Sequence, residues 1–123
     1  MHYMILIYSN EADWAKIPPA DLPAVFEKWM GYGQALQAAG VFRAGAQLQP
    51  VATATTLRFQ GGKVLSTDGP FAETKEQLGG YYLIETPDLD AAIKWAGQCP
   101  GLFNGCAIEV RPLVPGDKPE SPA

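Results

Sequence analysis

The segment from Asp68 to Glu76 holds the residue types best suited to chemistry in this chain. Asp68 opens an Asp-Gly-Pro sequence, and Glu73 and Lys75 follow it closely. A carboxylate at the mouth of a cleft can act as a general acid or base, or can anchor a ligand. Asp68 is therefore the predicted catalytic residue. Glu73 is a predicted contact to the substrate, and Lys75 is the predicted contact to an anionic group of it.

The same segment also has a purely structural interpretation. Asp-Gly-Pro is common in turns, where the Asp carboxylate accepts hydrogen bonds from backbone N–H groups, so a turn alone would account for Asp68. The charged stretch 72–77 is equally typical of a solvated loop. Both interpretations stay open at this point.

Aromatic and basic side chains elsewhere complete the predicted binding site. Tyr8 and Tyr82 offer aromatic and hydroxyl surface, and Phe71 offers an aromatic ring close to Asp68 in the sequence. Arg43 lies in a predicted strand, where a covered guanidinium needs an acidic side chain or an anionic ligand. We include these four residues as predicted substrate contacts. The tyrosines also fit a place in the core or in an interface between subunits.

Charge and composition exclude several classes of protein. The 123 residues carry a formal net charge of -4, and the nine basic residues are scattered, so no basic face is expected for nucleic acid. His2 is the single histidine, and Cys99 and Cys106 form no Cys-x-x-Cys pair. We therefore predict no metal, no cofactor and no histidine-dependent triad. Plain buried thiols are the expected state of the cysteines, and a redox-responsive protein is a disfavoured alternative.

The length of the chain favours one domain, predicted at 1–113, followed by a proline-rich tail at 114–123 that we expect to be flexible. No apolar run approaches the length of a membrane span, and the apolar run 3–8 is too short for the core of a signal peptide. We therefore expect a cytoplasmic protein without membrane contact.

Hydrophobic patterning predicts two helices and six strands, the strands at 3–8, 41–48, 53–59, 63–65, 81–85 and 107–110. The first helix runs from about 24 to 39, with a buried stripe of Val25, Trp29, Tyr32, Leu36 and Ala39. The second helix is predicted to begin with Thr86 as its capping residue and to bury Leu89, Ala92, Ile93 and Ala96. Gly61-Gly62 is predicted to be the turn of a β-hairpin.

This order of elements predicts an α+β fold. A β-α-β unit, a β-hairpin and a second β-α-β unit match a ferredoxin-like sandwich with an extra hairpin, in which two helices cover one face of an antiparallel sheet. The strands at 3–8 and 81–84 carry apolar residues on both sides, so the second face also needs a cover. A second copy of the chain is the simplest cover, and we expect a homodimer.

The sequence TDGPFAETKEQLGGYY at 67–82 resembles the hallmark of the DGPF branch of the YCII-related family. The opening YMILIY at 3–8, the Leu48-Gln49-Pro50 turn and the closing Val110-Arg111-Pro112 also fit that branch, so the resemblance runs to about Leu113. It implies a ferredoxin-like domain that pairs into a dimeric α/β barrel. Most members are uncharacterised, and some are encoded beside, or fused to, extracytoplasmic-function sigma factors.

Residues and resemblance together predict a protein that binds a small molecule. One form of this is a cofactor-free enzyme that carries out proton transfer or lyase/isomerase chemistry on a small polar or anionic substrate. The alternative is a non-catalytic sensor or interaction module linked to extracytoplasmic-function sigma-factor regulation. The enzyme would bring Asp68 and the loop 73–76 together at one polar cavity, whereas the module would expose an apolar patch on its surface.

Overall fold

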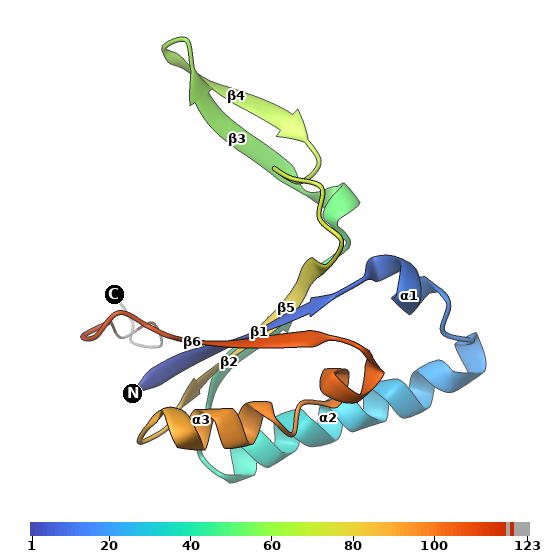
Figure 1. The fold of residues 1–123 in the computed structure, drawn as a ribbon, viewed down its shortest axis with the longest axis vertical. Coiled ribbons are helices and arrows are strands. Elements are labelled where there is room, and N and C mark those ends of the chain that lie inside the picture. The colour runs from blue at the N-terminus through green and yellow to red at the C-terminus, as the bar shows by residue number, and fades with distance from the viewer. Residues whose placement is uncertain (118, 120–123) are drawn as a thin grey trace.

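Strand β1 (His2–Ser9) lies inside a four-stranded antiparallel sheet in the computed structural model, which describes residues 1–117 and 119 (Figure 1). It pairs with β5 (Gln77–Glu85) on one side and with β6 (Ala107–Pro112) on the other. Strand β2 (Phe42–Gln47) pairs with β5 and completes the order β2-β5-β1-β6. Every second side chain of β1 is buried, as expected for an apolar strand with neighbours on both sides.

Two helices cover one face of this sheet, α2 (Leu22–Ala38) and α3 (Leu89–Ala96) (Figure 1). A third, short helix, α1 (Glu11–Ala15), follows β1 directly and is capped by the side chain of Asn10. The core lies between the sheet and α2 and α3, and it is formed by Tyr3, Ile5, Ile7, Tyr32, Leu36, Ile84, Ala92, Ala96, Cys99 and Cys106. The α+β class and the antiparallel sheet agree with the prediction, and the strand order is that of a ferredoxin-like unit.

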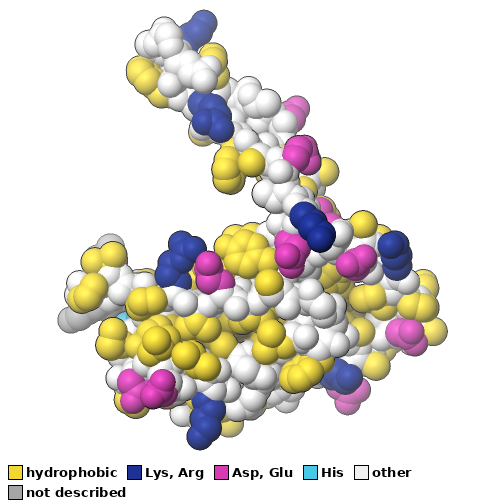
Figure 2. Space-filling view, in the orientation of Figure 1, with side chains coloured by type: hydrophobic (Ala, Val, Ile, Leu, Met, Phe, Trp, Pro, Cys, Tyr) yellow, Lys and Arg dark blue, Asp and Glu magenta, His cyan; other side chains and the backbone are white. Residues whose placement is uncertain are grey.

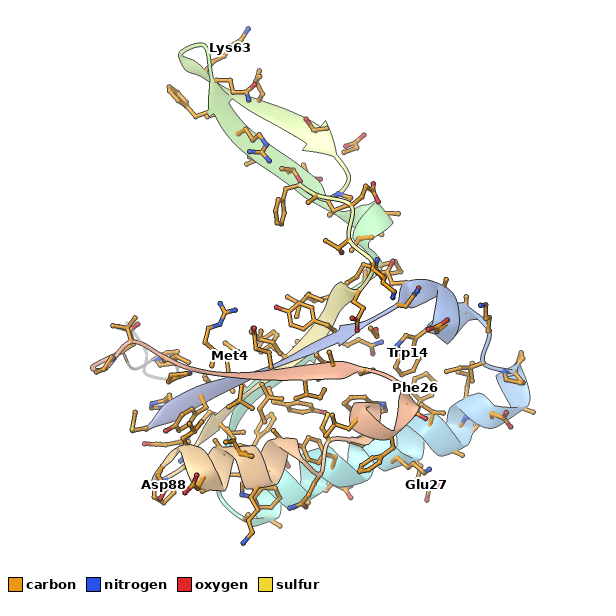
Figure 3. The ribbon with its side chains drawn as sticks, in the orientation of Figure 1. Met4, Trp14, Phe26, Glu27, Lys63 and Asp88 are labelled. Atoms are coloured by element: carbon orange, nitrogen blue, oxygen red, sulfur yellow. The ribbon has the colours of Figure 1, made fainter. Side chains whose placement is uncertain are left out.

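The opposite face of the sheet, here called the bare face, carries no helix of the described residues (Figure 1). Met4, labelled in Figure 3, lies on this side, directly across from Leu83 on β5 and Arg111 on β6. The strand register places further apolar side chains on the bare face, among them Leu6, Tyr8, Tyr81, Ala44, Ala46 and Ala107. Apolar residues therefore occupy both sides of the central strands.

Strands β3 (Thr55–Gln60) and β4 (Lys63–Asp68) form a separate two-stranded sheet, here called the arm. Gly61 and Gly62 at its tip have φ values of +59° and +80°, a conformation that glycine adopts without strain, and this confirms the predicted hairpin turn. The arm rises on the side of the sheet away from the helices (Figure 1) and stands clear of the body of the molecule (Figure 2).

The helix predicted to start at Thr86 starts later. Its capping residue is Asp88, whose carboxylate accepts a hydrogen bond from the Ala91 N–H, while the Thr86 hydroxyl donates to the Asp88 carbonyl. Within α3 the stripe of Ala92 and Ala96 is buried as predicted. The two larger side chains predicted beside it are not buried, since Leu89 is 46% and Ile93 52% exposed.

Strand boundaries also differ from the predicted ones. Strand β5 begins at Gln77 rather than 81 because its first residues pair with the end of β1, and β4 extends to Asp68 rather than Leu65. Of the predicted flexible tail, residues 118 and 120–123 lie outside the described part of the chain. Within that part, no helix has both the length and the apolar character needed to cross a membrane.

Candidate functional site

A small cavity lies at the end of the sheet where β1 passes into α1, and we call it the strand-end cavity. Its volume is about 140 Å³. It forms because Ser9 ends β1, Asn10 caps α1, and a 3-10 turn (Pro100–Asn104) brings the chain back past this point to Gly105 and β6. Its lining is mixed polar and apolar and consists of Ser9, Asn10, Asp13, Trp14, Ile17, Asn104 and Gly105.

The polar groups of the strand-end cavity come from segments that are distant in sequence. Ser9 is buried and brings a hydroxyl, while Asp13 and Asn104 are exposed and bring a carboxylate and an amide. Trp14 is half-buried and packs against the core, so its ring forms a fixed apolar part of the lining. Hydroxyl, amide and carboxylate groups beside an aromatic ring can orient a small polar molecule by hydrogen bonding and ring contact.

A hydrogen-bond network links α1 to the base of the arm. The Glu11 N–H donates to Oε1 of Gln77 at 3.0 Å, and Oε2 of Glu11 accepts from the Val51 N–H at 3.0 Å. The Gln77 side chain also donates to the Thr74 carbonyl at 2.6 Å, and the Thr74 hydroxyl donates to the Glu76 carbonyl at 2.6 Å. The loop 72–76 is thereby held where β1 ends and α1 begins, next to the strand-end cavity.

Asp68, the predicted catalytic residue, is the last residue of β4 and is exposed on the arm. The turn that follows it is held by the Gly69 N–H, which donates to the Ala54 carbonyl at 2.7 Å, and by the Thr56 hydroxyl, which donates to the Gly69 carbonyl at 2.7 Å. Gly69 itself has a φ of +101°. Among the described residues, none of the hydrogen bonds at this turn uses the Asp68 carboxylate.

The linker between the arm and β5 carries Phe71, Glu73 and Lys75, all of which are exposed. In the sequence they follow Asp68 and precede β5. None of these four residues is part of the cavity lining. The structure therefore holds the predicted loop near the start of α1, but it does not place the predicted side chains in the wall of the strand-end cavity.

Arg43 is engaged within the protein. Its Nε and Nη2 atoms donate to Oε1 of Glu85 at 3.2 and 3.0 Å, and its Nη1 donates to the carbonyls of Gly40 at 3.0 Å and Phe42 at 2.9 Å. Glu85 ends β5, whereas the loop 72–76 enters β5 at Gln77, so a whole strand of roughly 26 Å separates them. Of the two partners predicted for this guanidinium, the structure supplies the acidic side chain.

Tyr8 and Tyr82 lie on opposite faces of the sheet. Tyr82 pairs with Ile5 on the helix-covered face, and its ring centroid lies 5.3 Å from that of Tyr32 and 6.5 Å from that of Trp29. Tyr8 points to the bare face. Within one chain the two tyrosines therefore do not line the same site, and Tyr82 is a half-buried residue that packs against the core.

Burial sets the chemistry of the core hydroxyls and thiols. The Tyr32 hydroxyl donates to the Trp95 carbonyl at 2.8 Å, and burial raises the pKa of its phenol. Burial also raises the pKa of the Cys99 thiol to about 11, and burial together with the nearby Glu76 carboxylate raises that of Cys106. Both thiols are free and buried. A neutral, covered thiol is a poor nucleophile, so the thiols fit the predicted packing role.

Sequence reasoning missed the residues of the strand-end cavity. Ser9-Asn10 at the end of an apolar run and Asn104-Gly105 before the last strand are both visible as polar breaks. Their proximity depends on the pairing of β1 with β6, which aligns Tyr8 with Ala107 and so brings the two breaks to one end of the sheet.

The fold and these contacts define a small α+β protein with one antiparallel sheet and helices on a single face. The chain belongs to the YCII-related family, whose YCII-related domain matches residues 1–115. It is similar to an uncharacterized protein of Rhizobium meliloti (strain 1021), with 38% identity over 130 residues that cover 97% of this chain and 99% of the other.

A solved structure with some similarity is the 5-chloro-2-hydroxyhydroquinone dehydrochlorinase of Burkholderia phenoliruptrix AC1100 in complex with 2,5-dihydroxybenzoquinone. Its TM-score is 0.48 at 16% identity, over 94% of this chain and 96% of that chain.

Proposed function

We propose that this protein binds a small polar molecule at the strand-end cavity and acts as a homodimer. The observation that carries the proposal is the cavity itself, where the buried Ser9 hydroxyl, Asp13 and Asn104 lie around the half-buried ring of Trp14. At about 140 Å³ the cavity is smaller than a typical ligand site of roughly 300–1,000 Å³. It therefore suits a very small ligand, or one polar group of a larger ligand that extends along the loop 72–76.

The loop 72–76 provides the remaining contacts of the proposed site. Lys75 would bind an anionic group of the ligand there, with Glu73 and Phe71 beside it, and Tyr8 would contribute from the bare face. Asp68 stays our proposed acid or base for proton transfer or lyase/isomerase chemistry, because its carboxylate is free of turn hydrogen bonds. We assign structural roles, not ligand contacts, to Arg43 and Tyr82.

The bare face supports the homodimer. Met4, Leu6 and Tyr81 are only half-buried there, and they lie on the two central strands. Ion pairs lie at the sides of this apolar surface, one between Arg111 and Glu109 at 2.7 Å. A second copy placed face to face would cover the apolar centre and would produce the dimeric α/β barrel that the DGPF-type sequence at 67–82 implies. We propose that the chain belongs to that branch and, since its thiols are unbridged, that it acts in the cytoplasm.

The test is a thermal-shift screen of small organic acids and neutral metabolites, followed by titration calorimetry of each hit. The variants are Asp13→Asn at the cavity, Asp68→Asn on the arm, and Asp90→Asn on the exposed surface of α3 as the matched control. A hit that binds wild type and Asp90→Asn equally well, but binds Asp13→Asn at least tenfold more weakly, supports the cavity. Hits that bind Asp13→Asn and wild type equally, or no hit at all, would contradict it. Weaker binding by Asp68→Asn would add that residue to the site.

A second candidate function is the interaction module linked to an extracytoplasmic-function sigma factor. The observation that favours it is the exposed apolar surface of the arm, on Leu57, Phe59 and Val64. Purified sigma factor from the same genome would then bind this chain in calorimetry. Phe59→Ser would weaken that binding, whereas Asp13→Asn would leave it unchanged.

A further inference from the structure

The arm is amphipathic across its two faces. The pairings of Leu57 with Ser66 and of Phe59 with Val64 put three apolar side chains on one face. Leu57 is 63% exposed, Phe59 72% and Val64 66%. Asp68, paired with Thr55, lies on this same apolar face at the base of the arm. The other face is mainly polar and carries Thr56, Arg58, Gln60, Lys63, Leu65 and Thr67.

Within residues 1–117 and 119, which the structure describes, no element covers the apolar face of the arm. The arm is a two-stranded sheet whose main contact is its own ladder, and its apolar face is exposed along its length. An isolated two-stranded hairpin is marginally stable in water. The backbone bonds at the base, such as that from Gly69 to Ala54, fix where the arm starts but cover none of its apolar face. Among the described residues nothing covers this face, so a surface that covers it would come from another molecule.

We propose that the arm clasps a second copy of this chain with its apolar face, so that Asp68 lies in a site built by two chains. This inference rests on the proposed homodimer. The arm rises from one end of the sheet on the side of the bare face (Figure 1), so a copy seated on the bare face lies beside the arm. Hydrophobic side chains are exposed on the arm and on the body below it (Figure 2).

Charge favours a second copy over other partners. The arm, residues 55–68, carries two positive charges, Arg58 and Lys63 (the latter at the arm tip in Figure 3), and one negative charge, Asp68, so its net charge is +1. The chain as a whole carries -4, so the remainder carries -5. A basic arm is attracted to an acidic body of the same kind. An anionic membrane or a nucleic acid would instead repel that body as the arm approached.

The clasp accounts for the position of Asp68. In one chain its carboxylate projects from an exposed strand and is absent from the lining of the strand-end cavity. With the apolar face of the arm packed on a partner, the carboxylate would lie at the edge of a water-poor contact, where a polar group of a ligand can be held. The partner chain thus supplies the wall that Asp68 lacks in its own chain.

The first test is the oligomeric state by sedimentation equilibrium. The paired substitution Phe59→Ser with Val64→Ser removes two of the three apolar side chains on the apolar face of the arm, and Leu65→Ser on the opposite face is the matched control. Leu6→Lys changes the bare face. We expect a wild-type dimer, a dissociation constant at least tenfold weaker for the paired variant and for Leu6→Lys, and an unchanged dimer for Leu65→Ser. Circular dichroism checks that each variant is folded.

The outcomes separate the clasp from the homodimer itself. A monomeric wild type would overturn both, and binding of that monomer to phosphatidylglycerol vesicles would assign the arm to a membrane. A wild-type dimer that Leu6→Lys dissociates but the paired arm variant does not would keep the homodimer and refute the clasp.

The second test asks whether Asp68 is covered by the partner. Thiols are introduced by Asp68→Cys on the apolar face and, as the control, by Thr67→Cys on the other face, each in the wild-type and in the paired-variant background. Iodoacetamide should label position 68 at least tenfold more slowly in the dimer than in the paired variant, and position 67 equally in both. Equal labelling of position 68 in the two backgrounds would remove Asp68 from the interface. Cys99 and Cys106 are buried and contribute little background.

Discussion

The Glu11 carboxylate is expected to control local opening at the base of the arm. Its Oε2 atom accepts a hydrogen bond from the Val51 N–H at 3.0 Å, and Val51 begins the 3-10 turn that leads into β3. The substitution Glu11→Ala removes this acceptor while keeping the backbone bond from position 11 to Gln77, which uses the main-chain N–H. Glu11→Gln keeps an oxygen at a similar position and removes only the charge.

The magnitude follows from the type of bond. A hydrogen bond to a charged group contributes roughly 1.5–3 kcal/mol, and Glu11 is half-buried, so we expect the lower part of that range. About 1.4 kcal/mol corresponds to a tenfold change in an equilibrium constant, so the Val51 amide should open about ten times more often in Glu11→Ala. Glu11→Gln should lie between this variant and the wild type.

Native-state amide hydrogen exchange measures this opening directly. The Leu48 amide is the internal reference, because it donates to the Gly79 carbonyl at 2.8 Å and makes no contact with the Glu11 carboxylate. We expect faster exchange at Val51 with unchanged exchange at Leu48. Equal exchange at Val51 in wild type and Glu11→Ala would refute the role of the carboxylate, and equal acceleration at both amides would show general destabilisation instead.

Three further predictions concern the core and the sheet. Burial raises the pKa of the Cys99 thiol to about 11 in the folded state, whereas an ordinary thiol, as in the unfolded chain, has a pKa near 9.0. The free energy of unfolding should therefore fall as the pH rises between these two values. In urea unfolding, wild type should lose about 1 kcal/mol more stability than Cys99→Ala between pH 8 and 10. An added Cβ at Gly45 would lie 2.9 Å from Cδ1 of Tyr82, so Gly45→Ala should lower the free energy of unfolding in urea by about 1–3 kcal/mol. Gly31→Ala, which places its Cβ in open space on α2, should raise it by up to about 1 kcal/mol. Arg43→Ala should lower the melting temperature by calorimetry but leave the affinity for any hit of the ligand screen unchanged, because its guanidinium is bound within the protein.

The sequence was most informative where local chemistry and pattern agree. The run 3–8 is apolar throughout and became the central strand β1, and Gly61-Gly62 became a hairpin turn because positive φ angles are needed there. The cap of α3 shows the limit of local reasoning. Thr86 and Asp88 are both good capping residues, and the structure uses Asp88 for the helix and Thr86 for a bond to the Asp88 carbonyl.

The candidate site depended on information that local patterns do not contain. Tyr8 and Tyr82 lie on opposite faces because of the register between β1 and β5, which also contains an irregularity after Ile7. Asn104 reaches the strand-end cavity only through the pairing of β1 with β6. Arg43 was recognisable as needing a partner, but its choice of Glu85 follows from the pairing of β2 with β5.

The place of β1 in the sheet also bears on how the chain is made. β1 leaves the ribosome before every other element of the sheet, yet its two neighbours are β5 at 77–85 and β6 at 107–112. At roughly 5–20 residues per second, on the order of ten seconds pass between synthesis of the first strand and synthesis of its last partner. Until β5 has been made the apolar strand is without either neighbour, and until β6 follows it lacks one of them, and such segments are prone to aggregate. The nascent protein is therefore a candidate client for chaperones, and its folding is completed only when its last strand emerges.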